Sequence, residues 1–251
     1  MAWPGSQHKS TQRGIVFPRA LPREPRNVAP IDPPPAAPRR DVVEAEALAW
    51  LDANPAPAAS SVITSLPDVS ELALGFDAWR AWFLAAAQRV IRWVPDDGVA
   101  IFFQTDVRHR GVWVDKGYLV MRAAEDAGAS LVWHKIACRK PAGTYSNGRA
   151  TYAHLLCVSR APRPTTQMSP DVLPDAGRMP WSKAMGMNAC RLACRYLREE
   201  TDTRVVVDPF CGHGTALAVA NAQGLDALGV DVSRRQCKAA RRLVVTKGER
   251  D

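Results

Sequence analysis

The sequence predicts an α/β fold built on a mostly parallel sheet with an antiparallel hairpin at one edge. Short apolar, β-branched runs alternate along the chain with amphipathic segments of helical periodicity. The segment from Val205 to Asp231 has the pattern of strand, glycine turn, helix and second strand, which is one nucleotide-binding βαβ unit. Two further strand-like runs, 129–138 and 152–158, are joined by a loop rich in polar residues and predict the hairpin.

The βαβ unit contains the clearest binding chemistry of the sequence. Its opening run of three valines is typical of a strand buried on both faces. Asp208 and Pro209 end that strand, and Gly212 and Gly214 permit a tight turn in which a ligand lies against backbone amides. Asp231 ends the second strand, where its two oxygens suit a ribose diol.

The run Asp208-Pro-Phe-Cys-Gly-His-Gly-Thr215 resembles the S-adenosylmethionine motif of class I methyltransferases that modify amino groups of nucleic acids. The resemblance implies a Rossmann-like fold with S-adenosyl-L-methionine as cofactor. It also implies that Gly212 and Gly214 lie under the methionine part and that Asp231 takes the ribose hydroxyls. His213 replaces the family's small hydroxyl residue. The cofactor-binding residues predicted in this way are Asp208, Pro209, Phe210, Cys211, Gly212, Gly214, Thr215, Asp231 and Val232.

Composition narrows the class of protein. The 251 residues suit one large α/β domain plus a tail, and the net charge of +8 favours an anionic partner such as nucleic acid. No run has the length of a membrane span and the N-terminus lacks an apolar signal core, so we expect a cytoplasmic protein without membrane association. The six cysteines form no C-x-x-C pair and predict packed thiols, with no metal site.

The first 40 residues differ from the rest because they are rich in proline and arginine. They predict an extended or disordered arm, which serves either as a phosphate-binding tether or as a solubilising tail. A single methyltransferase domain is expected over 41–251, with a substrate half at about 60–160, a mobile loop at 161–180 and a cofactor half at 181–251. The spacing of apolar residues predicts a helix from Asp41, the expected cap, to Asn54.

A second motif lies at Ser61-Val-Ile-Thr-Ser-Leu-Pro-Asp68, a short strand that ends in a proline corner. It partly resembles the Thr-Ser-Pro-Pro-Tyr or Asp-Pro-Pro-Tyr site of the same family, where a polar residue and a carbonyl hold the substrate amine and an aromatic ring stacks on the base. Leu66 replaces the first proline, and Asp68 replaces the ring. The predicted catalytic residues are Ser65, Leu66, Pro67 and Asp68. The alternative is a plain strand end, and the methylated atom stays open.

The middle of the chain supplies the expected substrate contacts. Helices are predicted over 76–93 and 118–127, and a buried strand is predicted over 99–105. Polar residues after that strand fall at a carboxyl end, where ligand loops of such sheets lie, and the 139–149 loop combines cations with a stackable ring. A solvated face is the alternative. The predicted substrate-binding residues are Gln104, Asp106, Arg108, Arg110, Lys116, Arg139, Lys140, Tyr145 and Arg149.

The order of the motifs is informative as well. A helix over 181–198, capped by Ser182, leads into the cofactor strand, and a last helix is expected over 233–245. The substrate motif thus precedes the cofactor motif, which resembles the circularly permuted organisation of a bacterial class of DNA amino-methyltransferases. Little chain follows residue 245, so we expect the next sheet edge to be missing or supplied by another segment such as Gly14–Phe17.

These features favour methylation of a base nitrogen in structured RNA, such as tRNA or rRNA. The chain offers no separate target-recognition domain, which favours recognition by shape or through a protein partner. A DNA adenine or cytosine amino-methyltransferase that flips its base is the first alternative. A catalytically silent, cofactor- and RNA-binding subunit is the second, because of Asp68. The oligomeric state is left open.

Overall fold

The computed structural model describes residues 37–163 and 169–245 of the chain. The helices are α1 Ala47–Ala53, α2 Phe76–Trp93, α3 Lys116–Asp126, α4 Met187–Glu200, α5 Thr215–Ala222 and α6 Arg234–Arg242. The strands are β1 Arg40–Glu44, β2 Ser60–Thr64, β3 Ala100–Gln104, β4 Val107–His109, β5 Val112–Val114, β6 Ser130–Cys138, β7 Tyr152–Ser159, β8 Val172–Leu173, β9 Val205–Asp208 and β10 Asp226–Asp231. Most of the predicted arm, including Gly14–Phe17, lies outside the described residues.

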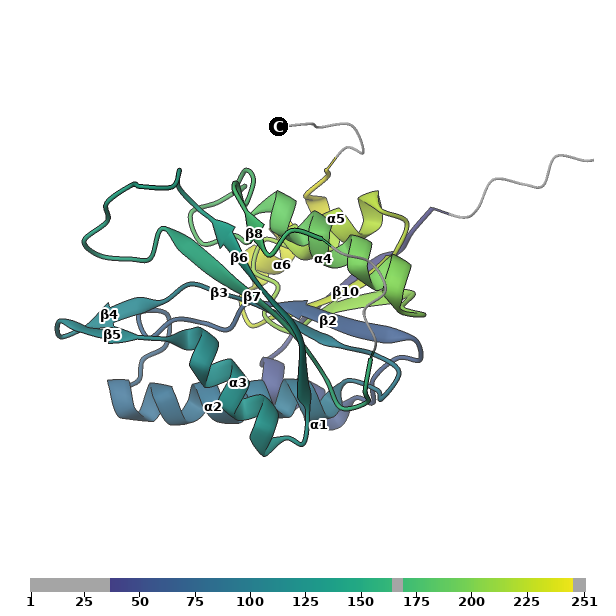
Figure 1. Cartoon of the computed structure of the whole chain (residues 1–251). Coiled ribbons are helices and arrows are strands. Elements are labelled where there is room, and N and C mark those ends of the chain that lie inside the picture. Colours follow the sequence, from purple (N-terminus) through teal and green to yellow (C-terminus); the bar gives the residue numbers. More distant parts are fainter. Residues whose placement is uncertain (1–36, 164–168, 246–251) are drawn as a thin grey trace, which may run out of the picture. The chain divides into compact units, whose positions relative to one another are not determined.

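One sheet in the described residues has the strand order β1-β10-β9-β2-β3-β7-β6-β8 (Figure 1). Neighbours from β1 to β3 run parallel, whereas β7 runs antiparallel to both β3 and β6. The predicted fold, a mostly parallel Rossmann-like sheet with an antiparallel hairpin, is therefore confirmed. The β6–β7 hairpin is extended at its outer side by the short strand β8.

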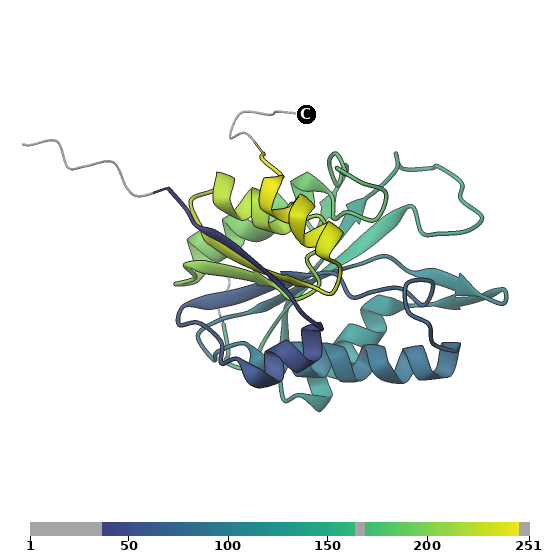
Figure 2. The ribbon, with the colours of Figure 1, turned by 180° about the vertical axis from the view of Figure 1, so that it is seen from behind.

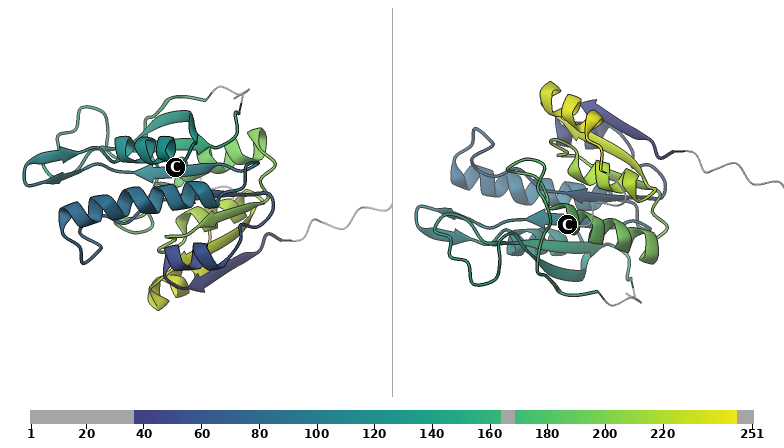
Figure 3. Two further views of the ribbon diagram at one scale, coloured as in Figure 1. Left: turned by 90° about the horizontal axis from the view of Figure 1, so that it is seen from below. Right: turned by 90° about the horizontal axis from the view of Figure 1, so that it is seen from above.

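Helices cover both faces of the sheet. Figures 1 and 2 show α1, α2 and α3 on one face and α4, α5 and α6 on the other, and Figure 3 shows the two layers from below and above. Two apolar clusters match these layers: Trp79 and Phe83 of α2 belong to the cluster that contains Phe102, while Leu217 of α5 belongs to the cluster that contains Ile101. Strands β2 and β3 are buried throughout, as expected for strands covered on both sides.

The sheet edge next to β10 corrects a prediction. Residues 40–44, expected within a helix beginning at Asp41, form strand β1 and pair in parallel with β10. The adjacent Val42 and Val43 favour a strand, and Val42 gains a buried position opposite Gly229. The helix follows at Ala47, where the Glu46 side chain accepts from the amide of Ala49 at 2.7 Å. The next sheet edge was expected to be missing or supplied by another segment such as Gly14–Phe17, and the segment that supplies it is β1.

Two other local predictions were wrong. Helix α4 begins at Met187 with Gly186 as its N-cap, not at Trp181 with Ser182 as the cap. Gly186 packs so closely on Ala176 that a Cβ would meet a carbonyl oxygen at 2.1 Å, which fixes the chain direction at that point. The basic stretch after β3, expected as a loop, is an antiparallel β4–β5 hairpin turned at Arg110 and Gly111. None of the helices in 37–163 and 169–245 has both the length and the apolar character that a bilayer crossing needs.

Candidate cofactor pocket and proline corner

A pocket of about 410 Å³ opens at the carboxyl ends of β2, β9 and β10, and we call it the main pocket. Ligands of doubly wound sheets bind at this end of the strands. Its lining residues are Glu46, Ala47, Ser65, Leu66, Pro67, Glu71, Leu72, Trp82, Trp181, Lys183, Ala184, Met185, Pro209, Phe210, Cys211, Gly212, Thr215, Asp231, Val232 and Gln236. All predicted cofactor residues except Asp208 and Gly214, and all predicted catalytic residues except Asp68, therefore line one cavity.

The glycine turn between β9 and α5 has the backbone that only glycine accepts readily. Gly212 has φ +52° and Gly214 has φ +77°, both in the left-handed region. A Cβ on Gly212 would meet the Trp181 ring at 2.8 Å, and one on Gly214 would meet Ala240 at 2.8 Å. Gly214 faces α6 closely and does not line the pocket, so its role is to let the turn approach that helix.

Asp208 lies beneath the turn instead of in the pocket wall. Its Oδ1 accepts from the Thr64 hydroxyl at 2.7 Å and from the amide of Phe210 at 3.1 Å. Its Oδ2 has no hydrogen-bond partner among the described residues, and the side chain is fully buried. Burial raises the pKa of Asp208 to about 7. Asp208 thus ties β2, which carries the proline corner, to the glycine turn.

Asp231 lines the pocket at the end of β10. Its Oδ2 accepts from the amide of Gly212 at 3.0 Å and its Oδ1 accepts from the amide of Ser233 at 2.8 Å. Partial burial raises the pKa of Asp231 above its ordinary value, and the two amides oppose that shift. Each carboxylate oxygen keeps a further lone pair for a ligand, so Asp231 is positioned as a two-oxygen acceptor.

Thr215 gives the pocket wall a buried hydroxyl without a partner. The residue opens α5 and lines the pocket, and its Oγ1 makes no hydrogen bond with any described residue. Buried polar atoms normally have a partner, so this hydroxyl points to a ligand atom as its missing partner. The free backbone amides at the start of α5 lie beside this hydroxyl and favour a negatively charged ligand group such as a carboxylate.

Two aromatic side chains in the pocket, Trp82 and Trp181, were missed by the sequence predictions, whereas Phe210 was among the predicted cofactor residues. Trp82 of α2 and Phe210 of the turn meet edge to face at 6.0 Å. Trp181 stacks on His213 with ring centroids 4.5 Å apart, which gives the histidine in the motif a packing role. Trp181 was expected to begin a helix, and the periodicity of that helix gave no sign that Trp181 lies in the pocket wall.

The proline corner, Ser65 to Asp68, follows β2 directly. Ser65, Leu66 and Pro67 line the main pocket, and the indole nitrogen of Trp79 donates to the Pro67 carbonyl at 3.2 Å. Thr64, one residue earlier, is the group that binds Asp208. The corner is therefore fixed from both sides.

Asp68 points into a second, narrower space that we call the side recess, with a volume of about 40 Å³. Asp68 is only 7% exposed and its Oδ1 pairs with the Lys116 ammonium at 3.0 Å, while its Oδ2 meets the Arg149 guanidinium at 3.4 Å. Ser65 and Leu66 line both spaces, so the recess adjoins the main pocket. The recess is lined by Ser65, Leu66, Asp68, Glu71, Phe103, Thr105, Lys116, Arg139, Arg149, Lys183 and Ala184.

Asp106 holds the backbone of Lys116 in place. Its Oδ1 accepts from the Lys116 amide at 2.8 Å, and its Oδ2 lies 3.0 Å from His154 Nε2 and accepts from the Tyr152 hydroxyl at 3.1 Å. His154 Nδ1 lies 2.9 Å from His134 Nε2. Burial alone would raise the pKa of Asp106, but the bonds from His154, Lys116 and Tyr152 together lower it.

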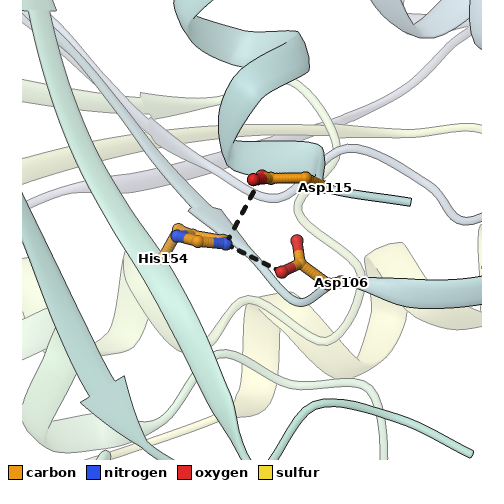
Figure 4. A group of neighbouring side chains, drawn as sticks. All are labelled: Asp106, Asp115 and His154. Atoms are coloured by element: carbon orange, nitrogen blue, oxygen red, sulfur yellow. Dashed lines mark hydrogen bonds and ion pairs between the residues drawn. The ribbon is translucent and has the colours of Figure 1, made fainter. Parts of the chain in front are cut away.

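The grouping of Asp106, Asp115 and His154 has the residue types of a metal site, with all three ligand atoms within 4.8 Å of one another. Figure 4 shows both carboxylates beside the same histidine nitrogen, at 3.0 and 3.7 Å. Hydrogen bonds account for this grouping, because both nitrogens of His154 already lie within bonding distance of other side chains. We therefore assign it a positioning role.

The remaining predicted substrate residues lie in three environments. Gln104 is fully buried and its amide atoms have no partner among the described residues. Arg108 lies over the Trp113 ring at 5.3 Å on the β4–β5 hairpin, where Arg110 forms the turn. Lys140 and Tyr145 are exposed in the β6–β7 loop, and Arg139 contacts Thr105 inside the recess. The structure brings Lys116, Arg139 and Arg149 together in the recess with Asp106 behind Lys116, and Arg108, Arg110, Lys140 and Tyr145 do not line the recess.

Comparison with solved structures identifies the class of fold. The chain has the class I methyltransferase fold, and it has it in the permuted order, with the proline corner before the glycine turn. It is similar to a Thermus thermophilus protein assigned as a DNA modification methylase, TTHA0409, with a TM-score of 0.61 and 20% identity over 81% of this chain and 92% of that one. A structure of that protein complexed with S-adenosyl-L-methionine has a TM-score of 0.60.

Two other solved structures agree. The cytosine-N4-specific PvuII DNA methyltransferase has a TM-score of 0.64 at 14% identity, over 82% of this chain and 86% of that one. M1.HpyAVI in complex with SAM has a TM-score of 0.54 at 13% identity, over 81% and 98%. No family model and no curated protein matches the sequence. At these identities the likeness establishes the fold, and activity is argued from the site.

Proposed function

We propose that the protein is an S-adenosylmethionine-dependent methyltransferase that modifies an amino group of a nucleic-acid base. The observation that carries this proposal is the meeting of two motifs in one cavity. The glycine turn and Asp231 form one wall of the main pocket, and Ser65 and Leu66 form another. A methyl donor held by the first wall lies beside a substrate amine held by the second.

The pocket has the donors and acceptors that S-adenosylmethionine requires. Asp231 offers two oxygens to a ribose diol, and the unpartnered Thr215 hydroxyl offers a donor to the methionine carboxylate. Trp82, Trp181 and Phe210 supply apolar surface for the adenine ring. The solved structures of TTHA0409 and M1.HpyAVI with this cofactor support the same assignment for this fold.

Transfer requires an in-line approach of a weak nucleophile to the methyl group. The bound cofactor supplies a methyl group on a positively charged sulfur. An exocyclic base amine is poorly nucleophilic, because its lone pair is delocalised into the ring, so it must be held by acceptors that favour a tetrahedral nitrogen. We assign this role to the Ser65 hydroxyl and the Leu66 carbonyl, because both residues line the main pocket. Trp79 and Asp208 fix the corner that carries them.

DNA is the polymer that we favour for this chain. The prediction of RNA depended on the lack of a separate target-recognition domain. The similar region takes up 92% of the Thermus protein and 98% of M1.HpyAVI, so these methylases also carry little beyond it. Compact size therefore does not distinguish the two polymers, and the neighbours named as DNA methylases support DNA.

Parallel transfer assays test the proposal. The purified protein is incubated with S-adenosylmethionine carrying a tritiated methyl group and with either genomic DNA or total RNA. We expect label in DNA and loss of that label in Asp231→Ala. Label only in RNA would overturn the choice of polymer and keep the enzyme class. Cofactor binding by calorimetry without label in either pool would favour the silent subunit.

A further inference from the structure

The side recess beside the proline corner has a charge pattern that selects among the bases. A buried carboxylate, Asp68, lies where related corners are expected to carry an aromatic ring. Lys116 and Arg149 form ion pairs with it, and two further cations, Arg139 and Lys183, line the same recess. Ser65 and Leu66 line both the main pocket and the recess, whereas Asp68 and the cations Lys116, Arg139 and Arg149 line the recess alone.

A carboxylate in this position discriminates because it only accepts hydrogen bonds. The ring nitrogen beside the amine of adenine or cytosine is itself an acceptor, so it would meet Asp68 without a proton between them. Guanine differs, because its amino group N2 adjoins N1–H, a donor, and N1–H adjoins O6, an acceptor. A buried acceptor that is left facing another acceptor disfavours the wrong base by roughly 10- to 100-fold.

We propose, on the basis of the methyltransferase function above, that the recess takes the Watson–Crick edge of guanine and that N2 is the methylated atom. Ser65 and the Leu66 carbonyl accept from N2, Asp68 accepts from N1–H, and the Arg139 and Arg149 guanidinium groups donate to O6. Each group of the guanine edge thus has a partner of matching hydrogen-bonding kind among the residues that line the recess.

The recess admits a base when Arg149 moves. The recess measures about 40 Å³, too little for a purine, and the Arg149 side chain is half-exposed at its rim. Its contact with Asp68, at 3.4 Å, is longer than the 3.0 Å contact from Lys116, which is buried and held by Asp106. Arg149 thus leaves Asp68 Oδ2 free for N1–H, while Lys116 keeps Asp68 oriented.

The reaction balances with these groups. The N2 lone pair forms the new N–C bond as the bond between the methyl carbon and sulfur breaks, and sulfur keeps the bonding electrons. N1 passes its proton to Asp68 as positive charge develops on the base. The methylated nitrogen then returns one of its protons to N1, and Asp68 releases its proton to solvent. The products are neutral N2-methylguanine, S-adenosylhomocysteine and one proton.

Nucleoside mass spectrometry of DNA and RNA treated with the wild-type protein tests the choice of atom. We expect N2-methylated guanine as the product, and none when inosine, which lacks N2, replaces guanine in an oligonucleotide. N6-methyladenine or N4-methylcytosine as the only product would overturn the guanine assignment and leave the proposed function standing. Absence of any methylated base would overturn both.

A change of base preference tests the contact with Asp68. In 2-aminopurine the amine is retained, but N1 accepts and O6 is absent, so the wild type should strongly prefer guanine. In Asp68→Asn the amide can donate to N1, and we expect the guanine to 2-aminopurine ratio of kcat/KM to fall at least about 10-fold. Asp96→Asn, which removes only an exposed partner of Arg160, is the matched control and should leave the ratio unchanged.

A purely structural role for Asp68 gives a different result. Activity would then fall equally on both bases, and this outcome would overturn the proposal even if Asp68→Asn folds normally by circular dichroism. Cofactor affinity should match the wild type in both variants, because Asp68 does not line the main pocket.

Discussion

The glycine-turn wall of the main pocket and the side recess adjoin each other, but they are built in different ways. The wall comes from one continuous segment, β9 through α6, and backbone amides hold its key acid, Asp231. The recess draws on residues from Ser65 to Lys183, and charged side chains hold its key acid, Asp68. If these sites bind as proposed, the key acid of the cofactor site is positioned by backbone amides, whereas the key acid of the substrate site is positioned by side chains from distant segments.

We expect the largest effect from a substitution in the glycine-turn wall. In Asp231→Ala we expect the Kd for S-adenosylmethionine to rise about 1,000-fold, on the order of 4 kcal/mol, because two charge-assisted hydrogen bonds to the ribose are lost. Isothermal titration calorimetry measures the change. Asp226→Ala is the control, since Asp226 begins the same strand and bonds only to Arg39 at the surface. Equal affinities in Asp231→Ala and wild type would refute the cofactor assignment.

The same contrast explains what the sequence could predict. The run from Val205 to Asp231 encodes its turn locally through Gly212 and Gly214, and its strand, turn, helix and strand were predicted in order. Strand β1 was missed because its stability comes from pairing with β10, nearly two hundred positions away in the chain. Propensity within residues 41–54 cannot reveal that partner.

The site shows the same limit. Lys116, Arg139 and Arg149 were predicted as substrate contacts on loop position alone, and their convergence on Asp68 depends on the sheet order β2-β3-β7-β6. Trp181 and Trp82 were missed in the pocket because each lies in a segment that was interpreted only as a packed helix. Gly186 was the one available signal that the helix begins after Trp181, because glycine disfavours the interior of a helix.

The second prediction tests how β2 is joined to the glycine turn. The pKa of Asp208 is about 7 in the folded protein and near 4 when unfolded, so between these values the folded state binds more protons. Stability therefore falls as pH rises from about 4 to about 7. Asp208→Asn removes this dependence on pH. We expect the free energy of unfolding of Asp208→Asn to exceed that of the wild type by on the order of 3 kcal/mol at pH 8 and to equal it near pH 4.

Urea denaturation at a series of pH values measures this difference. Asparagine keeps an oxygen for the Thr64 hydroxyl and the Phe210 amide, so the local structure is preserved. Asp226→Asn is the exposed control and should not change the slope. A difference between Asp208→Asn and wild type that does not vary with pH would contradict the buried, proton-binding role.

The third prediction concerns the hydrogen bonds behind the side recess. His154→Leu removes both the bond to Asp106 and the contact with His134, so we expect a loss of about 1–2 kcal/mol in the free energy of unfolding. Since Asp106 positions Lys116, methyl transfer should fall as well, with cofactor affinity unchanged. His134→Gln keeps a donor for His154 and should lose less than half as much stability. A higher Kd for the cofactor in His154→Leu would show that a change in the side recess also affects the glycine-turn wall.

The smallest expected effect lies at the exposed tip of the β6–β7 loop. Tyr145 is 97% exposed, so its ring stabilises nothing in the folded chain, and Tyr145→Ala should leave the melting temperature unchanged. If the ring stacks on a base, nucleic-acid affinity should fall by about 1 kcal/mol, or roughly 5-fold, in fluorescence anisotropy. Tyr145→Phe keeps the stacking surface and should bind as the wild type does. Equal affinities for all three proteins would confine substrate selection to the recess and its buried charges.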